Sequence, residues 1–142
     1  MNLERIGASH PLFEASFTLY EASFPPNERR TREDHLRAMQ DADFSPLGAV
    51  EAGDLLADVF LWETEDFSYL EHFAVQPSLR GQGCGTELLR QLLGRDKPLI
   101  LEIEPPEDAR TCRRKRFYER NGLRAQPYRH VQLPFQGGGP NV

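Results

Sequence analysis

The sequence predicts an α+β domain in which helices pack on a mixed, mostly antiparallel sheet. Three strand-like runs follow one another in the first half of the chain, at residues 46–51, 55–62 and 69–75. The last of these runs begins a strand–helix–strand–helix unit that continues through residues 86–93, 98–103 and 107–120. Antiparallel strands followed by a crossover unit favour helices packed against one sheet.

Two helices are expected before the strands. Residues 11–23 carry apolar side chains on one helical stripe, and the prolines at positions 25 and 26 end this helix. Thr31, with Asp34 in an acidic first turn, is typical of the start of a second helix that runs on through residues 35–40.

The later elements are marked by glycine and proline. Residues 52–54 (AGD) predict a hairpin connection between the first two strands, and Asn121-Gly122 predicts the end of the last helix. Residues 131–135 are expected to form a final strand, and the glycine-rich residues 136–142 a disordered tail. The chain is therefore interpreted as one domain over residues 1–135.

Length, charge and cysteine content exclude several classes of protein. A chain of 142 residues can bury a core of its own, and a net charge of −5 with a pI near 5.4 argues against binding nucleic acid or an anionic membrane. Cys84 and Cys112 fit neither a disulfide framework nor a metal site. No apolar run approaches membrane-spanning length and residues 1–9 lack a signal-peptide core, so a cytoplasmic location is expected.

The most informative segment is the turn between the strand at 69–75 and the helix at 86–93. Its glycines alternate at positions 81, 83 and 85, directly before the helix. Glycines let main-chain N–H groups point into one concavity, and a helix N-terminus adds partial positive charge. The segment predicts an anion site for phosphate or pyrophosphate, since a turn that merely starts a helix needs fewer glycines.

Two common phosphate-binding loops do not match this segment. A dinucleotide fingerprint requires the order G-x-G-x-x-G, whereas residue 86 is a threonine. A Walker-type loop requires Gly-Lys-Ser/Thr, and Gly85 is followed directly by Thr86. A protein that binds ATP or NAD is therefore disfavoured by spacing.

Arg80, Gly83 and Gly85 do resemble the Arg/Gln-x-x-Gly-x-Gly/Ala signature of the GCN5-related N-acetyltransferases (GNATs), placed after a strand end at residues 73–77 (FAVQP). A second stretch, residues 117–123 (FYERNGL), is similar to the helix ending of that family. The order of elements also fits, so the resemblance covers nearly the whole chain. It implies the acyl-CoA N-acyltransferase fold.

The resemblance implies acetyl-CoA as the acyl donor. In this family the motif strand splays from its neighbour, the pantetheine arm lies in the gap, and the glycine-rich turn holds the pyrophosphate. The implied cofactor-binding residues are Phe73, Ala74, Val75, Arg80, Gly81, Gln82, Gly83, Cys84, Gly85, Thr86 and Thr111. Thr111 stands where many relatives carry an asparagine that contacts pantetheine, and its hydroxyl can still form a hydrogen bond.

Tyr118 and Glu71 are the candidate catalytic residues. By resemblance, the phenol of Tyr118 protonates the departing CoA thiolate; the alternative is packing in the core, as expected for Phe117. Glu71 stands two residues before Phe73, so strand alternation places both on one face, where Glu71 would act as the base or as a substrate anchor. His72 is then expected on the opposite face, in a structural role.

Glu102 and Glu104 are the candidate substrate-binding residues, because carboxylates are unusual in an otherwise apolar strand. They mark either a solvent-facing edge or an acidic mouth that attracts a cationic amine. The basic residues of the helix at 107–120 are expected to interact favourably with the negative end of the helix dipole and to keep one face solvated. The alternative is that one of them binds the 3′-phosphate of CoA.

The expected function is thus an acetyl-CoA-dependent N-acetyltransferase that transfers the acetyl group directly to a primary amine, with a small cationic amine favoured and no metal required. The alternative is a noncatalytic CoA-binding sensor or interaction module on the same fold. Dimers are common in the family, so a homodimer is one assembly that the resemblance allows.

Overall fold

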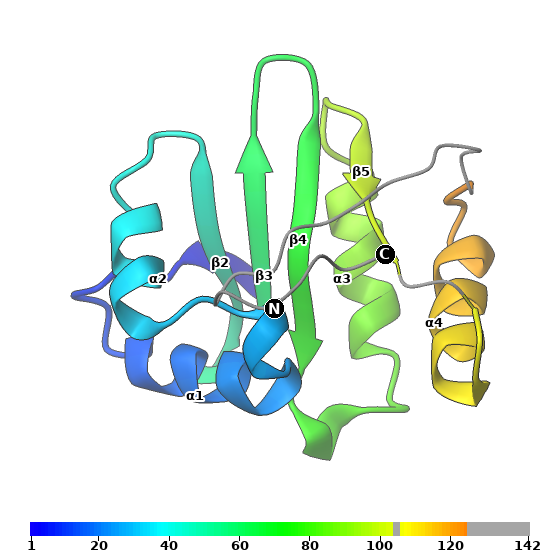
Figure 1. The fold of residues 1–142 in the computed structure, drawn as a ribbon, viewed down its shortest axis with the longest axis horizontal. Helices are drawn as coiled ribbons and strands as arrows, with labels where there is room; N and C mark the ends of the chain where they lie inside the picture. Colours follow the sequence, from blue (N-terminus) through cyan, green and yellow to red (C-terminus); the bar gives the residue numbers. More distant parts are fainter. Residues whose placement is uncertain (104–105, 125–142) are drawn as a thin grey trace.

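The computed structural model describes residues 1–103 and 106–124. Within them, one five-stranded sheet has the order β1-β2-β3-β4-β5 (Figure 1). The strands are β1 (Asn2–Arg5), β2 (Phe44–Glu51), β3 (Asp54–Glu63), β4 (Ser68–Val75) and β5 (Leu99–Leu101). Neighbours pair antiparallel except for β4 and β5, which are parallel and are joined through a crossover helix.

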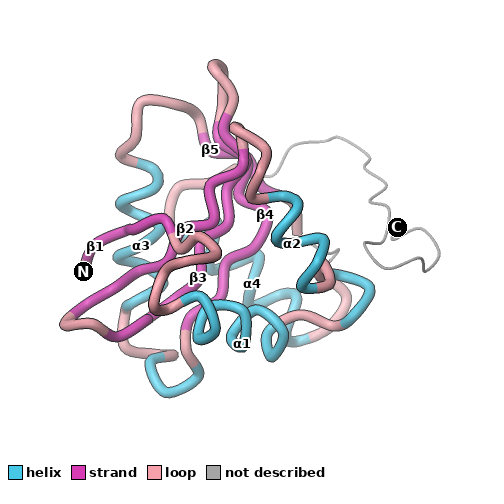
Figure 2. The backbone as a smooth tube through the Cα atoms, turned by 90° about the vertical axis from the view of Figure 1, so that its left-hand side faces the viewer, coloured by secondary structure: helices cyan, strands magenta, loops and turns pink. Residues whose placement is uncertain are grey.

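In the described part of the chain, four α-helices flank the sheet on both faces (Figure 2). They are α1 (Phe13–Ser23), α2 (Arg32–Ala38), α3 (Cys84–Leu93) and α4 (Ala109–Arg120), with short 3-10 turns at Pro26–Glu28 and Pro77–Leu79. On the face of α1 and α2, the buried cluster consists of Ile6, Phe13, Phe17, Tyr20, Phe44, Val50 and Phe60. On the other face, Leu88 and Leu92 of α3 pack against Ala49, Ala57, Val59, Leu61 and Leu70.

The predicted fold class is confirmed, and local signals placed most elements. The side chain of Thr31 accepts a hydrogen bond from the Asp34 amide at 3.2 Å, which is the expected start of α2. At the end of α4, Gly122 adopts a φ of 95° and stops the helix as its sequence predicts.

The differences lie at short or edge elements. β1 was not expected from the sequence, because it is a brief edge strand with largely exposed side chains and leaves little apolar alternation. β5 is shorter than the strand expected over residues 98–103. The strand expected at 131–135, the tail at 136–142 and Glu104 lie outside the described residues. Within the described parts of the chain, no helix is long and apolar enough to cross a membrane.

Candidate functional site

β4 and β5 run together for a short distance and then separate. β5 pairs with β4 at residues 68–70, whereas residues 71–75 of β4 have no partner in β5, and residues 72–75 of these pair with β3 alone. Figure 1 shows β5 beside one end of β4, with α4 standing further out beyond it. A cavity of about 50 Å³ lies at this separation, lined by Phe24, Leu70, Glu71, Phe73, Leu101, Glu102, Ile103, Arg114 and Tyr118.

The cavity brings together several residues that the sequence placed in the site. Glu71, Phe73, Glu102 and Tyr118 all line it, from β4, from the segment after β5 and from α4. Their convergence depends on the crossover, which returns the chain beside β4 after α3. Phe24 also lines the cavity, from the position that follows α1 and precedes two prolines.

Tyr118 enters the cavity from the last turns of α4. Its ring packs edge-on against Phe117, with 5.2 Å between ring centroids. Burial raises the pKa of Tyr118 above its ordinary value of 10, and the nearby charge of Arg114 opposes this effect. The phenol therefore keeps its proton through neutral pH and is suited to donate it.

The glycine-rich turn has the backbone geometry that its sequence predicts. Gly81 and Gly83 adopt φ values of 80° and 83°, in the left-handed region that side chains rarely occupy, and Gly83 directly precedes α3. The first N–H groups of a helix have no acceptor within it. The N–H groups of Arg80 and Gln82 donate only across long distances of 3.4 Å. This stretch therefore carries a set of weakly engaged donors.

Gly85 has a different role from the other two glycines. A Cβ atom at Gly85 would lie 3.4 Å from Cζ of Phe117 and 3.8 Å from Cγ2 of Val75. An added Cβ would therefore make ordinary van der Waals contact there, which shows that the start of α3 lies directly beside Phe117 of α4. This contact joins the glycine-rich turn to the helix that carries Tyr118.

The structure limits what two predicted cofactor-binding side chains, those of Cys84 and Thr111, can do. Burial, followed by the charge of Glu51, raises the pKa of Cys84, so its thiol stays protonated near neutral pH. The Thr111 hydroxyl is used in a capping box at the start of α4, where it accepts hydrogen bonds from the Glu107 and Asp108 amides at 2.9 and 3.0 Å. A pantetheine contact through Thr111 stays a prediction that would compete with this cap.

The expectation that Glu71 and Phe73 share a face is wrong, because β4 contains a β-bulge. Phe60 pairs with His72 and Leu61 pairs with Leu70, which leaves Glu71 as the extra residue. A bulge breaks strand alternation and re-aims a side chain. Phe73 packs with the clusters beneath α3, whereas Glu71 turns toward the side of α1 and α2.

His72 likewise lies on the same side as Glu71 and not opposite it. Its Nδ1 atom is 3.2 Å from Oε1 of Glu71, and Nη1 of Arg30 donates to the same oxygen at 2.5 Å. Burial raises the pKa of Glu71, but the hydrogen bond to His72 and the charge of Arg30 outweigh it, so the net pKa is lowered. The carboxylate is therefore ionised and well paired at neutral pH.

Glu102 lies just past β5 at the exposed mouth of the cavity. Its Oε1 atom accepts a hydrogen bond from the Tyr69 hydroxyl at 3.1 Å. Burial raises the pKa of Tyr69, and the charge of Glu102 adds to the effect. Tyr69 was not singled out from the sequence, although it lies on the motif strand.

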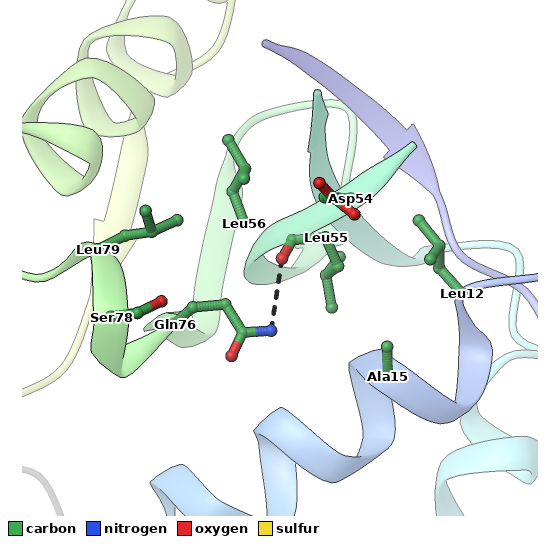
Figure 3. Close-up of a pocket in the computed structure, with 8 residues that line it drawn as sticks. All are labelled: Leu12, Ala15, Asp54, Leu55, Leu56, Gln76, Ser78 and Leu79. Atoms are coloured by element: carbon green, nitrogen blue, oxygen red, sulfur yellow. Dashed lines mark hydrogen bonds between the residues drawn. The ribbon is translucent and has the colours of Figure 1, made fainter. Parts of the chain in front are cut away.

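A larger hollow of about 420 Å³ lies elsewhere, between α1, the start of β3 and the turn after β4 (Figure 3). Its lining residues are Leu12, Ala15, Asp54, Leu55, Leu56, Gln76, Ser78 and Leu79. Neither Tyr118 nor Glu71 borders it. The candidate catalytic residues from the sequence therefore gather at the smaller cavity and not at the larger hollow.

Comparison with known proteins identifies the family. The GNAT acetyltransferase domain family matches residues 46–124, from β2 to the end of α4. A solved GNAT-family protein from Bacteroides thetaiotaomicron, assigned as an acetyltransferase, is 30% identical with a TM-score of 0.89, covering 97% of this chain and 80% of its own. The chain belongs to the GNAT acetyltransferase family, which confirms the resemblance seen in the sequence.

Two further comparisons define the extent of this likeness. YjbC of Bacillus subtilis (strain 168), assigned as an acetyltransferase, is 35% identical over 72 residues, which are 49% of this chain and 35% of YjbC. The chain thus spans about a third of the length of that relative. The structure of AAC(6')-Iy in complex with a bisubstrate analogue, CoA-S-monomethyl-acetylneamine, shares the fold, with a TM-score of 0.62 at 15% identity and coverage of 91% and 97%.

Proposed function

We propose that this chain is an acetyl-CoA-dependent N-acetyltransferase that transfers an acetyl group directly to a primary amine. The observation that carries the proposal is the position of the Tyr118 phenol in a cavity where β4 and β5 separate. A protonated phenol beside a gap in a sheet can serve a reaction that expels a thiolate. Membership of the GNAT family supports this chemistry.

The residues of β4 and the glycine-rich turn fit the acyl donor. The stretch of β4 that β5 leaves uncovered, residues 71–75, offers backbone groups of Phe73, Ala74 and Val75 for a pantetheine arm. The turn, from Arg80 to Thr86, offers N–H groups and the N-terminus of α3 for a pyrophosphate. The bound CoA analogue of AAC(6')-Iy supports a CoA site on this fold.

In direct transfer the acetyl group passes from CoA to the amine without a covalent intermediate on the protein, and the protein supplies a proton donor. The neutral amine nitrogen bonds to the thioester carbonyl carbon, the C–S bond breaks, and the Tyr118 hydroxyl gives its proton to the thiolate. Tyr118 then regains a proton from solvent, while the amine loses one to a base or to water. Cys84, with its raised pKa, is a poor nucleophile for a two-step route.

The mouth of the cavity favours a cationic acceptor. Glu102 is exposed there, Glu71 lies deeper as an ionised group, and Tyr69 holds the Glu102 carboxylate by its hydroxyl. Carboxylates attract an ammonium group and disfavour an acceptor carboxylate. Glu104 is part of this proposal from the sequence alone, as are a cytoplasmic location and a homodimer.

A screen of acetyl-CoA turnover tests the function. Thiol release is followed with amines, amino acids, peptides and polyamines as acceptors, and the acetylated product is identified by mass spectrometry. Turnover with at least one cationic amine is expected. Tight acetyl-CoA binding with no acetylation across the panel would instead support the CoA-binding sensor. If calorimetry finds that the protein binds ATP or NAD but not CoA, both the acetyltransferase and the CoA-binding sensor are excluded.

A further inference from the structure

A buried ion pair ties the segment between α1 and α2 to β4. We call this segment, residues 24–31, the α1–α2 connection. Arg30 lies in it, and Nη1 of Arg30 donates to Oε1 of Glu71 at 2.5 Å, with the two side chains only 8% and 9% exposed. The Arg30 guanidinium also stacks over the rings of Phe44 and Tyr20, 4.9 and 5.9 Å from their centroids. The pair is therefore both shielded from water and fixed in direction.

His72 extends this contact to a second point of the connection. Its Nε2 atom lies 2.8 Å from the carbonyl oxygen of Glu28, and a carbonyl only accepts, so Nε2 carries a proton and donates it. Its Nδ1 atom lies 3.2 Å from Oε1 of Glu71. Glu71 is thus engaged by both Arg30 and His72, which makes it a poor acceptor for a substrate proton.

The network also fixes one wall of the reaction cavity. Phe24 lines that cavity and packs edge-on against His72, with 4.6 Å between ring centroids. The Arg29 guanidinium holds the Phe24 carbonyl at 2.6 Å, and the Arg30 amide donates to the Tyr20 hydroxyl at 2.6 Å. Arg30, Glu71, His72 and Phe24 therefore form one chain of contacts from the α1–α2 connection to the cavity wall.

We propose that Arg30 is a positioning residue for acetyl transfer, which locks Glu71 and His72 so that Glu71 serves as a fixed anchor of the acceptor wall and not as the catalytic base. This inference rests on the proposed function. The carboxylate holds the cavity wall in place, while the amine proton leaves by another route. Arg30 acts through Glu71 and His72 and need not touch the substrate.

Kinetics of four variants test this assignment against wild type: Arg30→Met, Arg30→Lys, Glu71→Gln and the double variant Arg30→Met/Glu71→Gln. Arg30→Met leaves a buried carboxylate short of a partner, so kcat/KM for the amine should fall by about 20-fold or more. KM for acetyl-CoA should stay within about twofold, since the turn at residues 80–86 is untouched. Arg30→Lys keeps the charge and should recover at least about fivefold of the loss.

The double variant separates an anchor from a base. With neither charge buried, it should be at least about fivefold more active than Arg30→Met alone, because the two positions are coupled. If Glu71 is the base, Glu71→Gln loses roughly a thousandfold or more, and the double variant is no better. That result, or wild-type kinetics for Arg30→Met, would overturn the proposal. Arg32→Met is the matched control, since its ion pair with Glu14 is exposed.

Hydrogen exchange gives a readout that does not depend on turnover. In Arg30→Met, amides of the α1–α2 connection should exchange about tenfold faster or more, because the lock that protects them is gone. Arg32→Met should leave them unchanged. Unchanged exchange in Arg30→Met would overturn the lock even in an active enzyme. If the wild-type protein acetylates no amine but Arg30→Met still exchanges faster, the structural role of Arg30 is supported and the proposed function is rejected.

Discussion

Tyr118 of α4 and Glu71 of β4 line one cavity but sit in opposite electrostatic settings. Burial raises the pKa of Tyr118, whereas contacts with His72 and Arg30 lower the net pKa of Glu71 against the effect of burial. The phenol therefore keeps a proton to give, and the carboxylate has already lost its own. This division supports the proposed role of Tyr118 as the proton donor.

Tyr118→Phe should lower kcat by roughly 100-fold, since a positioned general acid contributes about that much or more. CoA affinity should hold within about twofold, because the change removes one hydroxyl from the cavity and leaves the turn at residues 80–86 intact. Stopped-flow thiol release and calorimetry with CoA measure the two quantities. A Tyr118→Phe variant with full kcat would show that the thiolate takes its proton from elsewhere.

The raised pKa of Tyr118 also has a consequence for alkaline conditions. Loss of the phenol proton should reduce kcat only above pH 10, the ordinary value for a tyrosine. The pH profile of kcat up to about pH 10.5 checks this in wild type. In Tyr118→Phe, any fall in kcat above pH 10 should disappear; a wild-type fall that persists in the variant would assign it to another group.

Gly83→Ala should weaken CoA binding by about tenfold or more, because its φ of 83° shapes the donors of the turn. Gly53 offers a matched control: it has the same φ of 83°, and at both positions an added Cβ would have no described atom within 4 Å beyond the adjacent residues of the chain. Both alanine variants should lose about 1–2 kcal/mol of stability from the left-handed backbone. Only Gly83→Ala should change the affinity for CoA measured by calorimetry. If the two variants bind CoA with equal affinity, the glycine-rich turn is not part of the CoA site.

The sequence could predict this turn because its geometry is encoded locally. Glycines at alternating positions before an amphipathic helix specify a backbone conformation without reference to the rest of the chain. The same is true of the Thr31 and Gly122 helix signals. Tyr118 was also predictable, since a resemblance to a known family fixes its place in the last helix.

The environment of Glu71 could not be predicted in the same way. Its orientation depends on a β-bulge, and its partner Arg30 lies on a distant connection that reaches β4 only in the folded protein. Strand alternation placed Glu71 beside Phe73, and the bulge reverses that placement. Neither the bulge nor the ion pair leaves a periodic trace in the sequence, so Glu71 was expected to be either the base or a substrate anchor.

Glu102→Gln should raise KM for a cationic amine by about 2- to 5-fold, because a solvated charge contact contributes at most about 1 kcal/mol. KM for acetyl-CoA should not change. The difference from wild type should shrink as salt rises, since exposed charges are screened. Glu65→Gln, an exposed change in the connection between β3 and β4, is the control. An equal rise in KM in both variants would indicate a general effect of net charge and not a local contact.

Asp58 on β3 should make stability fall as pH rises through the neutral range. Its carboxyl is fully buried and accepts one hydrogen bond from the Ser16 hydroxyl at 2.7 Å, and burial raises its pKa to about 8 from an ordinary value of 3.8. Between these values the folded chain holds a proton that the unfolded chain has lost. The folded state is therefore favoured most below about pH 4 and loses on the order of 1 kcal/mol for each pH unit up to about pH 8.

Asp58→Asn removes this proton from the folding equilibrium while it keeps an acceptor for Ser16. The free energy of unfolding of the variant, minus that of wild type, should increase steadily from pH 5 to pH 8 and stay constant above pH 8. Urea unfolding at pH 5, 7 and 9 would measure this difference. Asp54→Asn, an exposed change on the same strand, should retain the wild-type slope. If Asp58→Asn and wild type differ by the same free energy at all three pH values, the carboxyl is ionised in the folded protein and this account of its burial fails.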